Sequence, residues 1–404
     1  MTLPNWMIRA KSHVLALGLR TFSHRFDGAF SIFMGRPSPT DYGVPEREFV
    51  AADGRRIPVF ANYRYAAKVG WTYFASLNLL AAMERSGRLD ADESAYLKMA
   101  MGTRTIAVSP HEAVEVAKKA AERNAGLFLP GCLGDSGLPE LRPDERRLRE
   151  TIAIFKRRHA SMFQQLSAAG IFSIPRGASI LEIGFISGGH SIFAFEQLGF
   201  RAFGIDNCYG GLVGEMSVHG YNKSLLDSRA ELVSGDITHS TPFPSESMDV
   251  VFSASVLEHV QDLEAAFAEM YRLVKPGGAI IHNYSPYFCH DGGHALGIGD
   301  SPWAHVRMKK DEYLRYLAEL RPYEFETARE WFAHALHDDM PQWKVQRLVA
   351  AAGFRIGLWM AKPSPKRWLR DLTPEITRDC FSSMPEIGIE DLVSRSVSFV
   401  GIKA

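Results

Sequence analysis

The sequence has 404 residues, of which 46% are hydrophobic and 23% charged, so it can form two or three packed domains and is not typical of a disordered chain. Lys plus Arg and Asp plus Glu both number 46, and this balance argues against a strong overall attraction to nucleic acid. The four cysteines form no CxxC pair, which favours a reducing, cytoplasmic location over a zinc or disulfide framework.

Residues 1–143 are predicted to form a mostly helical region of unknown role. Within residues 5–26, apolar residues recur at helical spacing with Lys and Arg between them. This pattern fits either a membrane-surface helix or, as we favour, an amphipathic helix packed on the protein itself or on a second subunit. No apolar run approaches the roughly 20 residues of a transmembrane helix, so none is predicted.

Further helices are expected over residues 65–85, 92–101 and about 110–124. The last of these is preceded by Ser109 and has Glu112 three residues later, the spacing of a capping box. Residues 126–143 carry four glycines and three prolines and are predicted to be a linker. The domain boundary is therefore placed there, and a long helix over residues 144–169 is expected to lead into the second domain, residues 144–404.

The segment Leu181–His190 reads LEIGFISGGH, an apolar run that ends in an acidic residue and passes into a glycine-bearing turn. The pattern predicts a strand, a tight turn and a helix over residues 178–198. A second strand, residues 201–205, ends at Asp206, and Asp236 follows a third short apolar run. An acidic residue about twenty positions after a glycine turn is typical of a site for a ribose hydroxyl pair.

A fourth strand is predicted over residues 248–253, followed by the segment Leu-Glu-His-Val, a helix over 263–273, a Lys-Pro-Gly-Gly turn and a fifth strand over 279–282. Residues 285–340 interrupt the pattern with an insertion rich in histidine and aromatic residues. A helix over 342–352 and strands over 354–360 and 396–403 complete the sheet, and the stretch around Trp368 is expected on the surface between the last two strands.

This succession resembles the class I S-adenosylmethionine-dependent methyltransferases, most clearly over residues 150–290. The resemblance implies an α/β fold with a Rossmann-like sheet of seven strands, the last antiparallel and lying between strands five and six. It implies S-adenosylmethionine as cofactor and a small-molecule acceptor, with oxygen favoured as the accepting atom. The residues implied for the cofactor are Glu182, Gly184, Ser187 and Gly188 for its methionine part, Asp206 for the ribose, Asp236 and Ile237 for the adenine, and Ser253 beside the sulfonium.

One position departs from the family pattern of acid-x-Gly-x-Gly-x-Gly. Ile186 stands where the middle glycine is usual, and a β-branched residue makes a positive φ costly. A non-catalytic module that keeps the fold is therefore an alternative function. An NAD-dependent enzyme is a second alternative, against which the Leu-Glu-His-Val and Lys-Pro-Gly-Gly segments argue.

Methyl transfer to oxygen needs alignment and a base, and three histidines are candidates for that base: His259, His294 and His305. His259 has an alternative role in stabilising the loop that contains it. The insertion over residues 285–340 is interpreted as a lid over the acceptor, or else as a packed structural insert. No metal site is predicted at the Leu-Glu-His-Val segment, because Ser255 stands where related metal-dependent O-methyltransferases have a glutamate. The spacing of His290 and His294 would suit a metal on a helix, but the Asp-Gly-Gly between them disfavours a helix.

Overall fold

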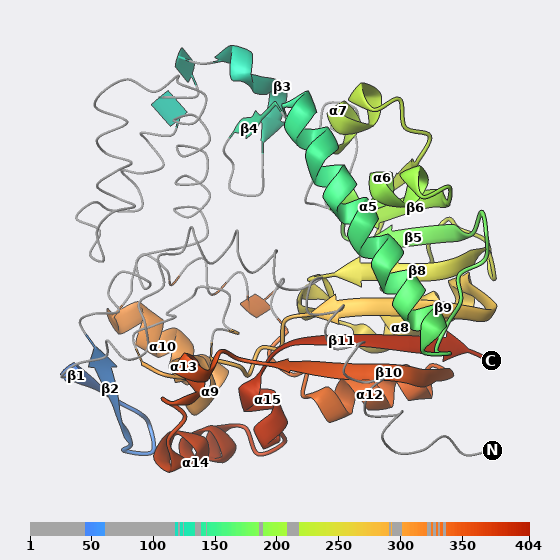
Figure 1. Ribbon diagram of the computed structural model, residues 1–404. Coiled ribbons are helices and arrows are strands. Elements are labelled where there is room, and N and C mark those ends of the chain that lie inside the picture. The colour runs from blue at the N-terminus through green and yellow to red at the C-terminus, as the bar shows by residue number, and fades with distance from the viewer. Residues whose placement is uncertain are drawn as a thin grey trace.

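A computed structural model describes residues 45–60, 118–119, 122–123, 125–133, 139–142, 144–185, 189–207, 218–290, 292, 301–320, 325, 329, 332–333 and 337–404. Its centre is a seven-stranded sheet in the order β10-β11-β9-β8-β5-β6-β7 (Figure 1). The strands are β5 (Ser179–Ile183), β6 (Arg201–Asp206), β7 (Glu231–Ser234), β8 (Met248–Ala254), β9 (Val274–Tyr284), β10 (Phe354–Pro363) and β11 (Ser394–Lys403).

The first five of these strands pair in parallel, whereas β11 is antiparallel to both of its neighbours, β9 and β10. The prediction of a Rossmann-like sheet whose last strand lies between the fifth and sixth is therefore confirmed. Strand β5 is buried along its whole length, as expected for a central parallel strand covered on both faces.

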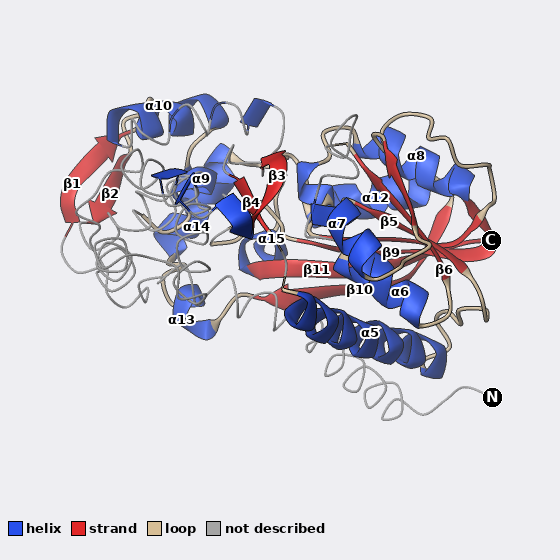
Figure 2. Cartoon of the chain, turned by 90° about the horizontal axis from the view of Figure 1, so that it is seen from above, coloured by secondary structure: helices blue, strands red, loops and turns tan. Residues whose placement is uncertain are grey.

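Helices cover both faces of the sheet (Figure 2). On one face lie α5 (Glu145–Ala168) and α6 (His190–Gln197), and on the other lie α8 (Leu263–Leu273) and α12 (Gln342–Ala351). Helix α5 begins where expected, because the Asp144 side chain accepts a hydrogen bond of 2.8 Å from the Arg147 N–H and so caps the first turn. Each face buries its own cluster of apolar side chains against the sheet.

A further hydrophobic core lies outside the sheet and is built from three distant parts of the sequence. The first part is a hairpin of β1 (Pro45–Val50) and β2 (Arg56–Phe60), and the second contains α9 (Ala304–Arg307) and α10 (Lys310–Leu320). The third contains α14 (Pro374–Ser383) and α15 (Ile389–Val393), and it is preceded by α13 (Lys366–Leu369). We call this cluster the second core.

The second core corrects one expectation, since the stretch between the last two strands is not a surface excursion. Trp368 is 2% exposed, and Cys380 and Leu392 from the same stretch are fully buried. Cys380 and Leu392 belong to the second core with residues from 49–59 and 287–332, and Trp368 stacks on His290. Local sequence patterns do not reveal these contacts between distant segments.

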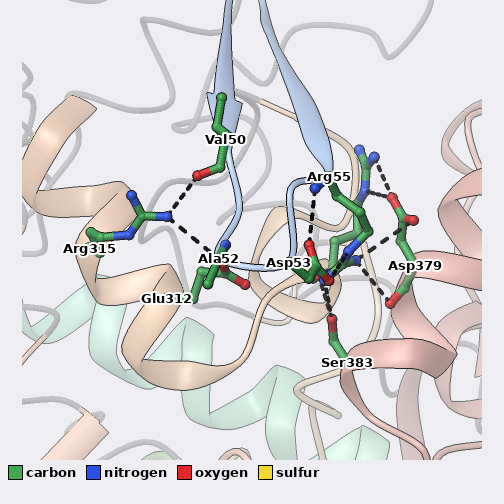
Figure 3. A network of polar contacts seen from close by, with 9 residues as sticks. Val50, Ala52, Asp53, Arg55, Glu312, Arg315, Asp379 and Ser383 are labelled. Carbon is green, nitrogen blue, oxygen red and sulfur yellow. Dashed lines mark hydrogen bonds and ion pairs between the residues drawn. The ribbon is translucent and has the colours of Figure 1, made fainter.

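Polar contacts join the hairpin of β1 and β2 to the second core (Figure 3). Arg55 donates hydrogen bonds to the Arg307 carbonyl at 2.9 Å and to the Ser383 hydroxyl at 3.0 Å. Arg307 is 2% exposed and forms two hydrogen bonds, of 3.0 and 2.7 Å, with one carboxylate oxygen of Asp379. Three segments that are far apart in the sequence are thereby joined around one buried guanidinium group.

The described parts of residues 1–143 contain strands that the sequence does not predict. Besides β1 and β2 there is a second hairpin, β3 (Phe128–Leu133) with β4 (Pro139–Leu141), inside the segment predicted as a linker. The helices expected over residues 65–85 and 92–101, and the segment 5–26, lie outside the described residues. Of the helices that the structure does describe, none combines the length and the apolar character needed to cross a bilayer.

Candidate active site

Two acidic residues lie at the carboxyl ends of neighbouring parallel strands, Glu182 on β5 and Asp206 on β6. Glu182 pairs in register with Gly204, and side chains two residues apart on a strand share a face, so Glu182 and Asp206 point to the same side of the sheet. That side is the one covered by α6, because a Cβ at Gly204 would lie 2.4 Å from the Ile192 Cδ1 atom. The side chains are 7% and 6% exposed.

The carboxyl group of Glu182 lies against the first turn of α6. Burial raises its pKa to about 8, opposed by hydrogen bonds from the Ile192 N–H and the Ser191 hydroxyl, while the charge of Asp206 raises it further. Its Oε2 atom is buried and has no hydrogen-bond partner among the described residues. An acceptor atom of this kind at a strand end indicates a place for a ligand donor.

The turn after β5 is closely packed at its start. Gly184 has a φ of 69°, and a Cβ there would lie 2.5 Å from the Val256 Cγ2 atom, so this position requires glycine. The Gly184 N–H donates to the Ile205 carbonyl at 2.8 Å and so ties the turn to β6. Ser187 and Gly188, together with Ile186, lie outside the described residues.

Two further cofactor candidates follow β7. Asp236 is partly exposed, and its Oδ1 atom accepts hydrogen bonds of 2.9 Å from both the N–H and the hydroxyl of Thr238. Ile237 is 4% exposed and belongs to the core on the α8 face. The structure thus places an acidic side chain and an apolar side chain at the end of the strand next to β6.

Ser253 lies at the carboxyl end of β8 and is fully buried. It is paired across the sheet with His282 on β9, and the two side chains form a hydrogen bond of 2.7 Å between the hydroxyl and Nδ1. Burial lowers the pKa of His282 to about 3, so its ring is uncharged near neutral pH. The sequence places both residues at the ends of neighbouring strands, but their direct pairing depends on the register between β8 and β9.

The loop after β8 holds a second buried acid, Glu258, which is 2% exposed. Its Oε1 atom accepts a hydrogen bond of 3.1 Å from the Ser285 N–H, and burial raises its pKa. Tyr284 ends β9 and is fully buried, and its pKa is raised well above the ordinary value by burial and by the charges of Asp391 and Glu258. The sequence points to the Leu-Glu-His-Val segment that contains Glu258, but the closeness of Glu258 to Tyr284 depends on the tertiary fold.

The three candidate histidines are placed differently. His259 is half-buried at the end of the 3-10 turn Leu257–His259 (η6), directly after β8, and so lies at the carboxyl edge of the sheet. His305 is 3% exposed in the second core, and its Nε2 atom lies 2.9 Å from the Tyr287 carbonyl, while the Tyr287 hydroxyl donates to the His305 carbonyl. His294 lies outside the described residues.

Two further features of the described chain, its possible metal ligands and a cavity, do not contribute to the candidate site at the carboxyl edge of the sheet. No three His, Cys, Asp or Glu side chains within the described ranges are arranged to hold a metal ion. A cavity of about 490 Å³ lies at the amino-terminal ends of the strands, lined among others by Arg201, Phe203, Phe243 and Lys275. It contains none of the candidate residues and lies at the edge opposite to them.

Comparison with known proteins gives a match for residues 181–282, which fit the model of a methyltransferase domain. An uncharacterized methyltransferase of Mycobacterium sp. (strain JLS) is 30% identical over 141 residues, 34% of this chain and 51% of the relative. One from Mycobacterium leprae (strain Br4923) is 27% identical over 124 residues, 31% of this chain and 43% of the relative. The chain thus spans about half the length of the curated relatives it matches.

Among solved structures, a putative sarcosine dimethylglycine methyltransferase from Galdieria sulphuraria is similar over 64% of this chain and 85% of its own, at 15% identity and a TM-score of 0.36. Geranyl diphosphate C-methyltransferase from Streptomyces coelicolor A3(2), solved with Mg²⁺, geranyl diphosphate and S-adenosyl-L-homocysteine, is similar over 64% of this chain and 83% of its own. In that case the identity is 13% and the TM-score is 0.38.

Proposed function

We propose that this chain transfers a methyl group from S-adenosylmethionine to a small molecule, with oxygen as the accepting atom, because residues 181–282 match the model of a methyltransferase domain. The observation that carries the proposal is the pair of buried acids, Glu182 and Asp206, at the carboxyl ends of adjacent parallel strands. Ligands of open parallel sheets bind beyond that edge.

The described residues fit this cofactor. Glu182 offers a buried acceptor atom to a ligand ammonium group, and Asp206 offers carboxylate oxygens to ribose hydroxyls. Gly184 supplies the positive φ that lets the backbone turn sharply after β5. We assign Ser187 and Gly188 to the methionine part, Asp236 and Ile237 to the adenine and Ser253 to the region of the sulfonium.

When bound, S-adenosylmethionine supplies an electrophilic methyl group, which forms a bond to the acceptor oxygen as its bond to sulfur breaks. The protein has to align the acceptor, and alignment can contribute roughly 7–11 kcal/mol of the barrier. It also has to take the proton of the acceptor hydroxyl. Of the two candidate histidines that the structure describes, we assign that task to His259, because its side chain is half-buried at the carboxyl edge.

His305 is better suited to positioning than to proton transfer. Its ring nitrogen is engaged by the Tyr287 carbonyl, and Tyr287 follows the end of β9 by three residues. In this proposal residues 285–340 form a lid over the acceptor. The contact of His305 with Tyr287 fixes the beginning of that segment. His294 stays a candidate for contact with the acceptor.

Binding of S-adenosylhomocysteine tests the proposal, measured by isothermal titration calorimetry with wild-type protein. Asp206→Ala is expected to weaken binding by about tenfold to a hundredfold, since a hydrogen bond to a charged group contributes about 1.5–3 kcal/mol. Glu231→Ala serves as control, because Glu231 is exposed at the opposite end of the neighbouring strand. Absence of binding to the wild-type chain would overturn the proposal.

Ile186 favours a second candidate, a binding module that keeps the fold without catalysis. A β-branched side chain at the middle position of the glycine turn resists a positive φ. Ile186→Gly distinguishes the two functions. If cofactor binding requires glycine at position 186, Ile186→Gly binds S-adenosylhomocysteine and the wild-type chain does not.

A further inference from the structure

The cavity at the amino-terminal ends of the strands has no role in the proposed function. Its volume is about 490 Å³, and small-molecule sites in proteins are usually about 300–1,000 Å³. The first residues of β5, β6, β7 and β8 line it, namely Ser179, Arg201, Glu231 and Met248. The cavity is therefore large enough for a small molecule, and the chemistry of its walls shows which kind.

One part of the cavity wall is apolar. Phe203 on β6 and Phe243 lie edge to face, with their ring centroids 5.8 Å apart. Val233 on β7 extends this wall, and both Phe203 and Val233 pack against the core on the α8 face. These two side chains stay partly exposed in spite of that packing, so an apolar ligand group would cover surface that water now contacts.

The segment that carries Phe243 is held in place by the end of α8. Glu269 accepts hydrogen bonds of 2.8 and 2.7 Å from the N–H and the hydroxyl of Thr241. Arg272 donates to the Phe243 carbonyl at 2.9 Å and to Glu269 at 2.6 Å. The apolar wall is thus formed before any ligand arrives, which lowers the entropic cost of binding.

A polar strip runs along the starts of the strands at the same cavity. The Arg201 guanidinium donates at 2.7 Å to the hydroxyl of Ser179. The Ser179 N–H donates at 2.8 Å to Asp249, and the same Asp249 oxygen accepts at 2.7 Å from the Lys275 ammonium group. The charge of Lys275 is therefore offset by Asp249, whereas the partner of Arg201 is an uncharged hydroxyl.

Arg201 is the charge for which this arrangement supplies no counter-ion. It forms no ion pair with any residue that the structure describes. Glu231 also lines the cavity, but in the register of the sheet it is opposite Phe203 and not opposite Arg201. The planar guanidinium group matches a carboxylate in two parallel hydrogen bonds. A molecule with a carboxylate and an apolar body would therefore meet both parts of the wall.

We propose that this cavity is a second binding site, for a small amphiphilic anion whose carboxylate contacts Arg201 and whose apolar body covers Phe203 and Phe243. An aliphatic chain and an aromatic ring share this chemistry, and octanoate and 2-naphthoate represent them. The inference goes beyond the proposed function and does not depend on it. Ser179 and Glu182 lie towards opposite ends of β5, so the two sites are expected to bind independently.

A titration of each anion with wild-type protein, followed by the NMR signals of the ligand, tests the proposal. At least one of the two anions is expected to bind with a Kd of about 1 mM or tighter. It should bind about tenfold more tightly than its uncharged analogue, 1-octanol or 2-naphthalenemethanol, and about tenfold more tightly than acetate, which lacks the apolar body. Absence of binding by both anions, or equal affinity for an analogue or for acetate, would overturn it.

Arg201→Gln removes the charge and is expected to abolish the preference for the anion over its uncharged analogue. Arg229→Gln is the matched control, because Arg229 is an exposed arginine two residues before β7 that does not line the cavity. An equal loss in both variants would show a general attraction to positive charge and would contradict the assigned site. The comparisons on wild-type protein decide the inference even if Arg201→Gln does not fold.

The same titration in the presence of excess S-adenosylhomocysteine separates this site from the candidate active site. The affinity for the anion is expected to stay unchanged. Displacement of the anion would place it at the carboxyl edge of the sheet and overturn the inference. If wild-type protein binds the anion but not S-adenosylhomocysteine, the proposed function fails and this inference stands.

Discussion

At the scale of single residues, Gly184 shows how tightly the turn after β5 is constrained. Gly184→Ala is expected to lose about 1–2 kcal/mol from the left-handed backbone and a further 1–3 kcal/mol from contact with Val256. Gly177→Ala is the matched control, because Gly177 has a φ of 66° but nothing within 4 Å of an added Cβ. Chemical denaturation measures both losses, and equal losses would show that Val256 moves aside.

His282 predicts a loss of stability in acid. Its pKa falls from 6.5 to about 3 on burial, so as the pH drops below about 6.5 the unfolded chain takes up a proton that the folded chain refuses. Between about pH 7.5 and pH 5 this costs about 2 kcal/mol of folding free energy.

In His282→Leu we expect the difference in stability between those two pH values, measured by urea denaturation, to shrink by about this amount. The overall stability also falls, because Ser253 loses its hydrogen-bond partner. His239→Leu is the surface control, since the His239 side chain is 79% exposed. If His282→Leu shows the same difference in stability between the two pH values as wild type, water reaches the His282 ring in the folded protein.

Sequence patterns identified part of the candidate site. Glu182, Asp206 and Ser253 each lie at the end of an apolar run, and the resemblance to a known family implies that these run ends lie at the carboxyl edge of a parallel sheet. The pairing of Ser253 with His282 depends on the register between β8 and β9. The closeness of Tyr284 to Asp391 joins segments that are more than 100 residues apart in the sequence. No local pattern carries that information.

At the scale of elements, the helices α9 and α14 are joined by the buried ion pair of Arg307 with Asp379. The hairpin β1–β2 is joined to both helices through Arg55, which donates to the Arg307 carbonyl and lies 3.7 Å from an Asp379 carboxylate oxygen. Asp379→Ala leaves the Arg307 guanidinium, which is 2% exposed, without its carboxylate, and is expected to cost about 3–5 kcal/mol. The matched control is Glu48→Ala, whose partner Arg56 is 72% exposed and whose loss should cost at most about 1 kcal/mol. Guanidinium chloride denaturation compares the two, and similar costs would contradict a structural role for the buried pair.

The elements of the sheet domain were predictable, and those of the second core were not. Helix α8 was expected over its full length, Leu263–Leu273, because its apolar spacing and the following Lys-Pro-Gly-Gly turn are both local signals. The hairpin at Pro45–Phe60 was missed because its buried residues, such as Ile57, pack against partners more than 200 residues away. A short strand acquires its partner only from such tertiary contacts.

At the scale of the whole molecule, the sheet and the second core are separate hydrophobic clusters, and they are expected to respond separately to mutation. Ile57→Ala in the second core and Ile180→Ala in β5 both truncate fully buried side chains and should each cost about 2–5 kcal/mol. Hydrogen exchange followed by mass spectrometry is expected to show faster exchange over residues 45–60 and 301–320 in the first variant, and over the sheet in the second. Uniformly faster exchange in both variants would mean that the two cores unfold as one unit.

The position of β11 has a consequence for the order in which a newly made chain can fold. Strand β11 lies between β9 and β10, yet it is the last of the seven to leave the ribosome. At about 5–20 residues per second, β5 to β9 can pair while synthesis continues, but β10 has no neighbour until residues 394–403 appear. Completion of the sheet therefore waits for those ten residues, and a chain that stalls before them presents two unpaired strand edges to its surroundings.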